Sequence, residues 1–194
     1  AHHMQDNVES ILMHIFRGSG IRGLRGMSLD DGTLLRPMLK TSREDVEDYI
    51  KRNFVPYVDD STNKSQDYSR NKLRLSVMPL LREIYGGVDG NVIRLADRAN
   101  ELCNHLDGIC KGYDNRLDGI FIPLAVLQGD KVIASYTVIN AVDEITTRVD
   151  LTQKHINSIL DLAEKNRGAS VSLPFGLTAY RDEDGVVLAK LQTV

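Results

Sequence analysis

The chain has 194 residues, 42% of them hydrophobic and 26% charged, with five prolines and a formal net charge of −3. This composition excludes fibrous and disordered proteins. No apolar run reaches the roughly 20 residues of a membrane-spanning helix, and no secretory signal opens the chain. We therefore expect a globular cytoplasmic protein, with no membrane partner, that holds one domain or two small ones.

The first predicted element is an amphipathic helix that begins near residue 5, because its apolar residues recur at intervals of three and four. These residues are Val8, Ile11, Leu12 and Ile15. Gly18 ends the helix, and a glycine-rich, flexible loop follows over residues 18–26. The loop is basic, since it carries or adjoins Arg17, Arg22 and Arg25.

The next stretch alternates short apolar segments with turn-forming residues. Residues 33–39 contain a proline and are expected to be extended rather than part of a central strand. Thr41 and Glu44 have the spacing of a capping box, which predicts a helix over about residues 42–53. A loop rich in Asp, Ser and Asn follows.

Two further helices are predicted in the middle of the chain. The first spans about residues 65–83 and is bent or broken at Pro79. The second, over about residues 89–113, has the clearest helical periodicity in the sequence. It carries Cys103 and Cys110, which lie too far apart along a helix to form a disulfide, so we expect two buried thiols in a reducing compartment.

The last third of the chain changes from helical to β periodicity. We expect a loop over residues 112–119 and a short strand directly after it, while residues 131–143 could be helix or strand. Thr152 caps a helix that ends before Gly168. The β-rich pieces within residues 170–190 predict a terminal hairpin with a partner strand.

Two carboxylates and two imidazoles gather at the start of the first predicted helix. Asp6 and Glu9 are neighbours on one helix face, close to His2 and His3. Such a cluster can hold an ammonium group, coordinate a divalent cation or do acid–base chemistry. Two simpler explanations are that acids suit the first turn of a helix, whose dipole they complement, and that the histidines belong to an affinity tag.

A basic stripe forms the second candidate. Arg70 and Arg74 are one helical turn apart and suit a phosphate group, with Asn71 beside them as a donor and acceptor. The simpler explanation is a solvent-exposed helix face. The excess of Lys and Arg over Asp and Glu in residues 1–82 is slight, so charge alone does not decide for a nucleic-acid partner.

Taken in order, these motifs resemble one family, the tRNA(Ile)-lysidine synthetases of the PP-loop ATP pyrophosphatase group. The family pattern runs HHxDDQxET, RGSGxxGLxGM, RPLL, SRxE, an acidic SN loop and RNxxR. This chain reads HHMQDNVES, RGSGIRGLRGM, RPML, SRED, DDSTN and RNKLR, and later SLPFGLTAYR for the family's LPxGLxAxR. Gln5 replaces the first aspartate of the pattern. Because the match continues past the histidines, it argues against an affinity tag.

The resemblance implies an α+β, mostly helical fold. Residues 1–82 would be the C-terminal part of a doubly wound α/β PP-loop domain, and residues 83–194 a helical, tRNA-binding domain that ends in a β-hairpin. The implied enzyme is a ligase that uses ATP to adenylate the C2 oxygen of the wobble cytidine in isoleucine tRNA. L-lysine then displaces AMP to give lysidine. Mg²⁺ is an implied cofactor, and a homodimer is left open.

The resemblance also implies roles for individual residues. Asp6 and Glu9 would bind the cationic groups of lysine, or Asp6 would hold Mg²⁺, and His3 would lie beside the nucleotide. Phosphate or tRNA contacts are expected from Arg36, Arg70, Asn71 and Arg74. A glycine-rich loop that lets tRNA or nucleotide approach the backbone is expected at Gly18, Ser19 and Gly20.

The family's ATP site also includes an SGGxDS loop, in which backbone N–H groups cradle phosphates. No such sequence occurs in these 194 residues, which do not begin with Met. We therefore expect a partial chain that does not turn over ATP by itself. The alternatives are a non-catalytic tRNA-binding module, with residues 85–194 as the docking domain, and a related PP-loop enzyme such as a tRNA thiolase. The two cysteines do not favour the thiolase.

Overall fold

A computed structural model describes residues 2–58, 69–146 and 151–190. The chain forms two compact units, unit 1 (Ala1–Cys103) and unit 2 (Asn104–Val194). Their boundary lies inside a long helix rather than between elements. The sequence-based division at residues 82 and 83 stays a prediction. The mostly helical α+β class is confirmed, and the doubly wound arrangement of the first domain stays a prediction.

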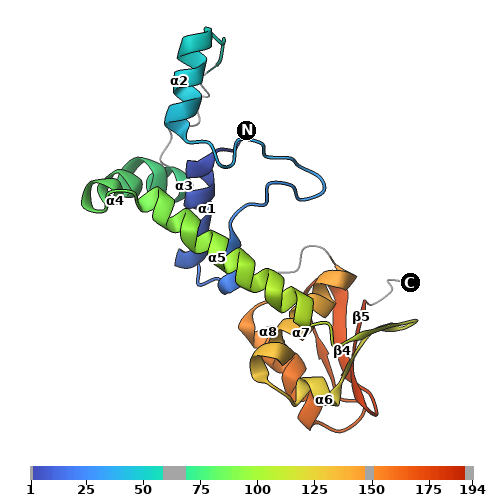
Figure 1. The fold of residues 1–194 in the computed structure, drawn as a ribbon. Coiled ribbons are helices and arrows are strands. Elements are labelled where there is room, and N and C mark those ends of the chain that lie inside the picture. The colour runs from blue at the N-terminus through green and yellow to red at the C-terminus, as the bar shows by residue number, and fades with distance from the viewer. Residues whose placement is uncertain (1, 59–68, 147–150, 191–194) are drawn as a thin grey trace. The chain divides into compact units, whose positions relative to one another are not determined.

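Unit 1 consists of helices and loops in the part that the structure describes. Its elements are α1 (Met4–Phe16), the 3-10 turn η1 (Ile21–Arg25), α2 (Arg43–Asn53), α3 (Ser69–Lys72), the π turn η3 (Leu73–Val77), α4 (Met78–Ile84) and α5 (Val88–Ile109), which continues into unit 2 (Figure 1). A small apolar core holds α1 against η3 and α4. Its buried members are Val8, Leu12, Leu73 and Met78.

The π turn η3 follows from Pro79. A proline has no backbone N–H, so it cannot donate to the carbonyl four residues earlier. Directly before the proline, the Met78 N–H bonds to the Leu73 carbonyl, five residues back, which is the hydrogen-bond pattern of a π turn. The helical turns continue through Pro79, which lies in the first turn of α4, and the irregularity expected there takes the form of a local widening directly before α4.

Unit 2 is an antiparallel sheet with helices on one face (Figure 1). Its elements are β1 (Asp114–Arg116), β2 (Gly119–Pro123), α6 (Leu124–Leu127), α7 (Lys131–Ile145), α8 (Gln153–Leu160), the 3-10 turn η4 (Asp161–Glu164), β3 (Ser170–Ser172), the 3-10 turn η5 (Pro174–Gly176), β4 (Leu177–Arg181) and β5 (Gly185–Lys190). The strand order is β1-β2-β5-β4-β3. The predicted hairpin, β4 and β5, and its partner β3 are confirmed.

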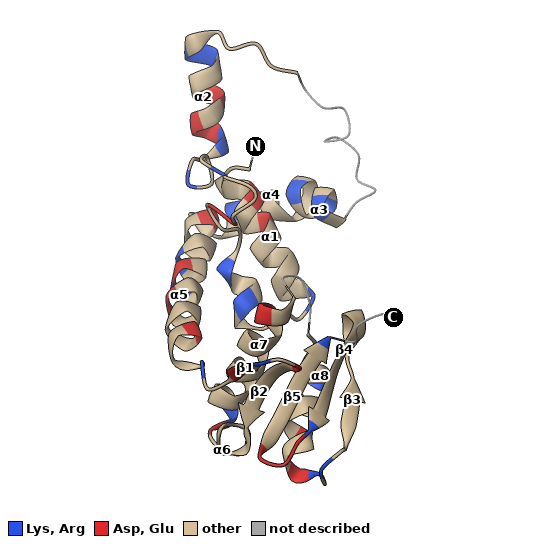
Figure 2. Cartoon of the chain, turned by 90° about the vertical axis from the view of Figure 1, so that its right-hand side faces the viewer, with Lys and Arg blue, Asp and Glu red and all other residues tan. Residues whose placement is uncertain are grey.

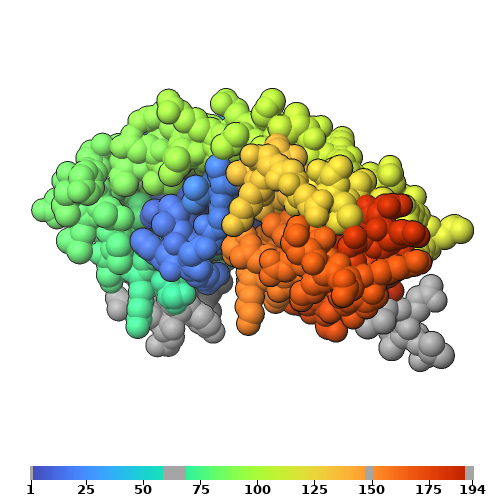
Figure 3. All heavy atoms as spheres, turned by 90° about the horizontal axis from the view of Figure 1, so that it is seen from below, coloured from blue at the N-terminus to red at the C-terminus, as the bar shows by residue number. Residues whose placement is uncertain are grey.

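The core of unit 2 lies between the sheet and the helices. Buried residues from β2, β4 and β5 meet Val138 and Val142 of α7 and Ile156 and Ile159 of α8. Figure 3 shows one face of unit 2, where the yellow, orange and red segments form a continuous surface. In β4 the alternation of buried and half-buried residues marks the face that packs on the helices, whereas the central strand β5 is buried throughout residues 185–188 and does not alternate.

Several boundaries differ from the sequence-based expectations. The α2 helix is capped by Ser42, whose side chain accepts a hydrogen bond from the Asp45 N–H, and not by Thr41. The segment expected to be a loop over residues 112–119 contains β1. Its residues are all exposed, so it lacks the apolar alternation by which strands are recognised. The long helix α5 ends at Ile109 rather than near residue 113.

Residues 131–143, which could be helix or strand by sequence, belong to helix α7. Asp130 caps this helix by accepting hydrogen bonds from the N–H groups of Val132 and Ile133. That capping residue was the available signal. Residues 33–39 form turns with one isolated bridge, between Asp30 and Leu35. Among the described helices, none is both long and apolar enough to cross a membrane.

Candidate functional site

The first two turns of α1 bury an unusual number of polar side chains. Averaged over the whole residue, Gln5, Asp6, Asn7 and Glu9 are each less than a tenth exposed. Buried polar groups are costly unless hydrogen bonds satisfy them. Each of these four side chains has such partners, and the partners come from segments far away in the sequence.

Asp6 and Glu9 bind the two arginines of the RNKLR motif. Glu9 accepts from the Arg70 Nε at 3.0 Å and from the Arg74 Nε at 2.6 Å, with a second bond from the Arg74 Nη2 to Glu9 Oε2 at 2.8 Å. Asp6 Oδ1 accepts from the Arg74 Nη2 at 2.6 Å, and the Asp6 backbone carbonyl accepts from the Arg70 Nη2 at 3.0 Å. We call these four residues the carboxylate–arginine cluster.

The charges of the cluster cancel, with two carboxylates against two guanidinium groups. The Glu9 side chain is 3% exposed, whereas the Arg70 side chain is 35% exposed. The hydrogen bond to Glu9 is the main reason why the pKa of Arg74 is raised. The two-point contact between Arg74 and Glu9 fixes the guanidinium plane as well as its charge. The cluster therefore holds two oriented arginines whose remaining surface faces solvent.

His3 stands at the N-cap of α1, next to the cluster. Its backbone N–H donates to Asp6 Oδ2 at 3.0 Å, and its imidazole Nε2 lies 3.4 Å from the same oxygen. Asp6 therefore binds both the N-cap residue of α1 and an arginine of the cluster. Its position is explained by the helix end, whose dipole an acid complements, and by its place in the candidate site. His2 directly precedes this cap and is half-buried.

A Mg²⁺ ion does not fit the carboxylates in this arrangement. Asp6 and Glu9 point their oxygens at guanidinium groups, and a magnesium ion needs those oxygens for itself in an octahedral set. Within residues 2–58, 69–146 and 151–190, no group of three or more His, Cys, Asp or Glu side chains is placed to hold a metal ion.

A pocket of about 540 Å³ lies within unit 1, on another face of α1. The glycine-rich loop forms one wall and is fixed to α1, because Asn7 Oδ1 accepts from the Met27 N–H at 2.7 Å. Gly26 has a positive φ of 69°, and a Cβ there would come within 2.4 Å of Asn7 Oδ1. A side chain at this position would break the contact. Polar groups at the pocket include Arg22, Arg25, Lys40 and Asp97.

Asn7 and Asn100 are residues whose importance the sequence did not reveal. Asn100 accepts from the Arg25 Nε at 3.0 Å and donates to the Arg25 carbonyl at 2.9 Å, so it ties the loop to α5. In the sequence, Asn100 lies within the periodic pattern of a helix and carries no motif. Only the approach of the loop to α5 reveals it.

The remaining predicted residues are placed as follows. Arg36 donates to Asp31 Oδ2 at 2.8 Å and to the Ser28 carbonyl at 2.9 Å, so it joins the two ends of the loop that contains it. Its hydrogen bond to Asp31 is the main reason why the pKa of that carboxyl lies well below the usual range. Asn71 lies half-buried in α3, beside the cluster arginines in sequence. The DDSTN motif lies outside the described residues.

The Gly18, Ser19 and Gly20 loop caps the end of α1. The N–H groups of Gly18 and Ser19 donate to the carbonyls of Ile15 and His14, and Gly18 has a positive φ of 77°. These two amides are therefore engaged by the helix end. No neighbouring atom lies within 4 Å of where a Cβ would stand at Gly18 or Gly20, so the loop is open on that side.

Comparisons with known proteins agree with the motif order. Residues 1–81 match the PP-loop domain family. A protein named tRNA(Ile)-lysidine synthase from Caldanaerobacter subterraneus is 28% identical over 204 aligned residues, covering 100% of this chain and 43% of the relative. One with the same name from Bacteroides thetaiotaomicron is 37% identical, covering 61% of this chain and 26% of the relative.

A third relative of that name, from Parabacteroides distasonis, is 44% identical over 97 residues, which is 50% of this chain and 22% of the relative. The chain therefore spans less than half the length of these curated relatives. The segment that contains the carboxylate–arginine cluster falls within the matched PP-loop region, residues 1–81.

Proposed function

Since this chain belongs to the tRNA(Ile)-lysidine synthase family of PP-loop proteins, we propose that it is part of an ATP-dependent ligase that joins lysine to the wobble cytidine of isoleucine tRNA. In this reaction the C2 oxygen of the cytidine attacks the α-phosphate of ATP and pyrophosphate leaves. The lysine amine then attacks C2, the C2–O bond breaks, and AMP leaves with that oxygen while the nitrogen loses a proton. We also propose a cytoplasmic location.

The observation that carries the proposal is the carboxylate–arginine cluster. Two motifs about 60 residues apart in the chain supply its two halves, and both occur in the family pattern. A leaving AMP and a tRNA backbone carry phosphate, and lysine carries ammonium groups. A neutral cluster of fixed carboxylates and guanidinium groups offers partners to both kinds of charge.

The geometry divides the roles within the cluster. Glu9 is almost fully buried and accepts three hydrogen bonds from the arginines, so we assign it to positioning Arg70 and Arg74. Asp6 is more exposed, at 12%, and a carboxylate can accept about four hydrogen bonds. We therefore assign the substrate amine to Asp6. Arg70, the most exposed member, is assigned to phosphate.

The other candidates receive weaker roles. His3 would contact the nucleotide through its imidazole at the α1 N-terminus, with Asn71 as a donor beside Arg70. Arg36 would have to leave Asp31 before it could bind phosphate. The loop at Gly18–Gly20 would admit tRNA or nucleotide on its open side. Because the 194 residues contain no SGGxDS sequence, we propose that they do not cleave ATP by themselves.

The test uses an enzyme that contains these residues together with its ATP site. Asp6→Asn keeps the size of the side chain and removes its charge. We expect lysine transfer to isoleucine tRNA to fall by at least about tenfold, the loss of one charged hydrogen bond of roughly 1.5–3 kcal/mol, while pyrophosphate release is retained. Asp45→Asn, on the exposed face of α2, is the matched control. Equal losses of both steps in Asp6→Asn would contradict the role of Asp6.

A further inference from the structure

The pocket of about 540 Å³ in unit 1 is lined by more cations than carboxylates. We call it the loop pocket, because the glycine-rich loop forms one of its walls. Its charged lining residues are Arg22, Arg25, Lys40 and Asp97. Within the part of the chain that the structure describes, neither Lys40 nor Asp97 forms a salt bridge. Both side chains can therefore bind a ligand without first leaving an ionic partner there.

Arg22 and Arg25 project from the same side of the 3-10 turn η1. Side chains three positions apart eclipse each other in such a turn, and both arginines line the loop pocket. Two guanidinium groups that line one cavity suit a phosphate group. The family pattern RGSGxxGLxGM leaves both positions open, so this pair of arginines is a property of this chain and not of the motif.

Asn100 of α5 fixes the position of Arg25. Its carboxamide contacts the side chain and the backbone of the arginine at once, because it accepts from the Arg25 Nε at 3.0 Å and donates to the Arg25 carbonyl at 2.9 Å. The contact does not involve the Nη groups of the guanidinium. A side chain that is already held loses less conformational freedom when it binds a ligand, which is the advantage of a preorganised site.

The remaining wall of the loop pocket is largely apolar. Its apolar members come from α1, from the loops and from α5: Met4, Met27, Leu29, Leu39, Ile93 and Ala96. An apolar lining with a few fixed polar groups, in a volume between about 300 and 1,000 Å³, is typical of a small-molecule site. The methionines can also adapt their shape to a ligand.

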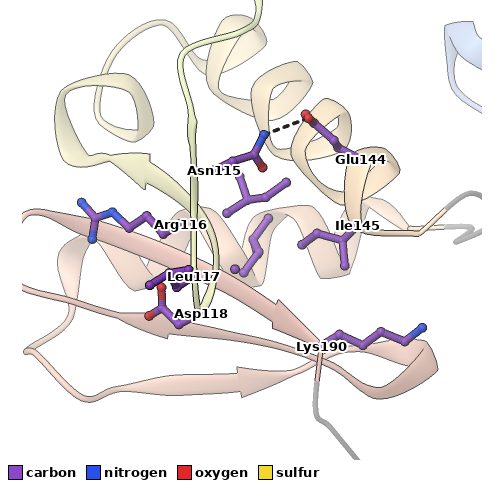
Figure 4. Close-up of a pocket in the computed structure, with 10 residues that line it drawn as sticks. Asn115, Arg116, Leu117, Asp118, Glu144, Ile145 and Lys190 are labelled. Carbon is purple, nitrogen blue, oxygen red and sulfur yellow. Dashed lines mark hydrogen bonds between the residues drawn. The ribbon is translucent and has the colours of Figure 1, made fainter.

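The pocket of unit 2, of about 490 Å³, offers a poorer set of charged groups (Figure 4). Asn115 donates to Glu144 at 3.0 Å, and the Tyr180 hydroxyl binds Asp118 at 2.5 Å. Arg116 points away from Glu144 in Figure 4. The turn between β4 and β5, also in unit 2, is acidic (red in Figure 2). The loop pocket of unit 1 is therefore the better site for an anionic ligand.

We propose that the loop pocket binds a mononucleotide, with its phosphate on Arg22 and Arg25, and that Asn100 is a positioning residue for this site. The apolar wall suits the base, and the Asp97 carboxylate accepts hydrogen bonds from ribose hydroxyls. The inference goes beyond the proposed function, in which phosphate is assigned to Arg70. It also needs no SGGxDS loop, which these 194 residues do not contain.

The test measures the binding of labelled AMP to the 194-residue chain by equilibrium dialysis. Salt at about 0.15 M screens the contribution of distant exposed charges. Arg25→Ala should weaken AMP binding by about tenfold to a hundredfold, the loss of a charged hydrogen bond. Arg98→Ala is the matched control and should bind like the wild type, because Arg98 is an exposed arginine of α5 outside the pocket lining.

Asn100→Ala should have a smaller effect on AMP binding, because the cation stays but is no longer held. We expect a loss of about twofold to tenfold, the effect of ordering one side chain. In the Arg25→Ala background, Asn100→Ala should cause no further loss, since it acts through the Arg25 side chain. A role in loop structure alone would add a further loss there and would overturn the positioning role.

Melting temperatures show whether each variant is folded. If Arg25→Ala unfolds, Arg22→Ala replaces it as the test of the site, because it leaves the contact between Asn100 and Arg25 in place. The same loss of about tenfold to a hundredfold is expected for this variant. AMP binding that is unchanged in the folded arginine variant would place the nucleotide elsewhere and overturn the site.

Three further outcomes would overturn the mononucleotide site. These are no measurable binding of AMP at millimolar concentration, equal losses in Arg25→Ala and Arg98→Ala, and binding of a single-stranded RNA through Arg25 without binding of AMP. The proposed function would stand in each case, because lysine transfer tests it separately. Conversely, AMP binding that depends on Arg25 would support the site even if an intact enzyme did not transfer lysine.

Discussion

The two units stabilise their folds with different kinds of buried side chain. In unit 1 the small apolar core is accompanied by four buried polar residues on one helix, and the carboxylate–arginine cluster joins α1 to α3 and η3. In unit 2, sheet and helices enclose a larger core of aliphatic side chains. Among the described residues of unit 2, Thr137 is the buried polar residue.

Because of this difference, the two units should tolerate different kinds of substitution in their interiors. An apolar core needs only matching shape and volume, whereas a buried charge needs its partner in place. Buried ion pairs are poor stabilisers compared with apolar packing, so their presence in unit 1 fits a role in chemistry. The polar parts of unit 2 are accordingly at its surface, at the two ends of the sheet.

The largest expected effect comes from Glu9→Ala. It leaves Arg70 and Arg74 with Asp6 but without the more deeply buried carboxylate of the cluster, so unit 1 should lose about 3–5 kcal/mol of stability. Amide hydrogen exchange measures this loss separately in each unit. Glu47→Ala is the control, because Glu47 pairs with Arg43 on the exposed face of α2 and should change little. A loss of less than about 1 kcal/mol in Glu9→Ala would show that the cluster is not stabilising.

The next largest loss of stability is expected in unit 2, from a substitution for which the backbone leaves no room. Gly119 has a φ of 147°, and a Cβ there would come within 2.1 Å of the Leu188 carbonyl oxygen. Gly119→Ala should therefore cost about 1–3 kcal/mol through strain and local displacement of β2 from β5. Urea unfolding measures the change.

Gly108→Ala is the matched control for Gly119→Ala. Gly108 lies in α5, and no neighbouring atom lies within 4 Å of where a Cβ would stand there. Alanine is the better helix former, so this variant should be more stable than the wild type by roughly 0.5–1 kcal/mol. Destabilisation of both variants to the same degree would show that the β2–β5 approach is not the cause.

A smaller effect tests the corrected start of α2. Ser42→Ala removes the side chain that accepts from the Asp45 N–H at 3.0 Å, which should cost about 1 kcal/mol of helix stability. Thr41→Ala should have almost no effect. Hydrogen exchange at the first turn of α2 distinguishes the two variants, and the reverse ranking would restore Thr41 as the cap.

The smallest effect concerns alkaline pH. The hydrogen bond to Asp118 is the main reason why the pKa of Tyr180 is raised to about 12, and burial raises the pKa of Tyr113 to about 12. A raised pKa favours the neutral phenol in the folded state. Its contribution is therefore complete below the unfolded value, about 10, and is lost as the pH rises towards 12.

Tyr180→Phe should reduce this alkaline loss of stability in unit 2, and should cost about 0.5–1.5 kcal/mol at neutral pH through the lost hydrogen bond. Absorbance titration of the tyrosines, run alongside thermal unfolding at each pH, measures both effects. A variant with the same alkaline profile as the wild type would show that Tyr180 does not titrate as described.

Local sequence determined most of the secondary structure. The intervals of Val8, Ile11 and Leu12 define the buried face of α1, the alternation in residues 177–181 indicates β4, and the apolar run over residues 186–189 indicates the central strand β5. These patterns work because a helix and a strand repeat at fixed periods, so one buried face leaves a periodic trace. Strand β1 was not predicted, because an exposed strand has no buried face and therefore no periodic pattern of apolar residues. The type of α7 stayed open because its apolar residues suit a helix and a strand alike, and only the cap at Asp130 distinguishes the two.

The motifs by themselves also determined the family, since their order along the chain is a property of sequence alone. The tertiary structure decided how they act together. Asp6 and Glu9 were expected to bind lysine, and Arg70 and Arg74 to bind phosphate. In the folded chain the two carboxylates bind the two arginines. No local pattern encodes a contact between residues 61–68 positions apart. Such a contact depends on how α1 packs against α3 and η3, which only the folded chain defines.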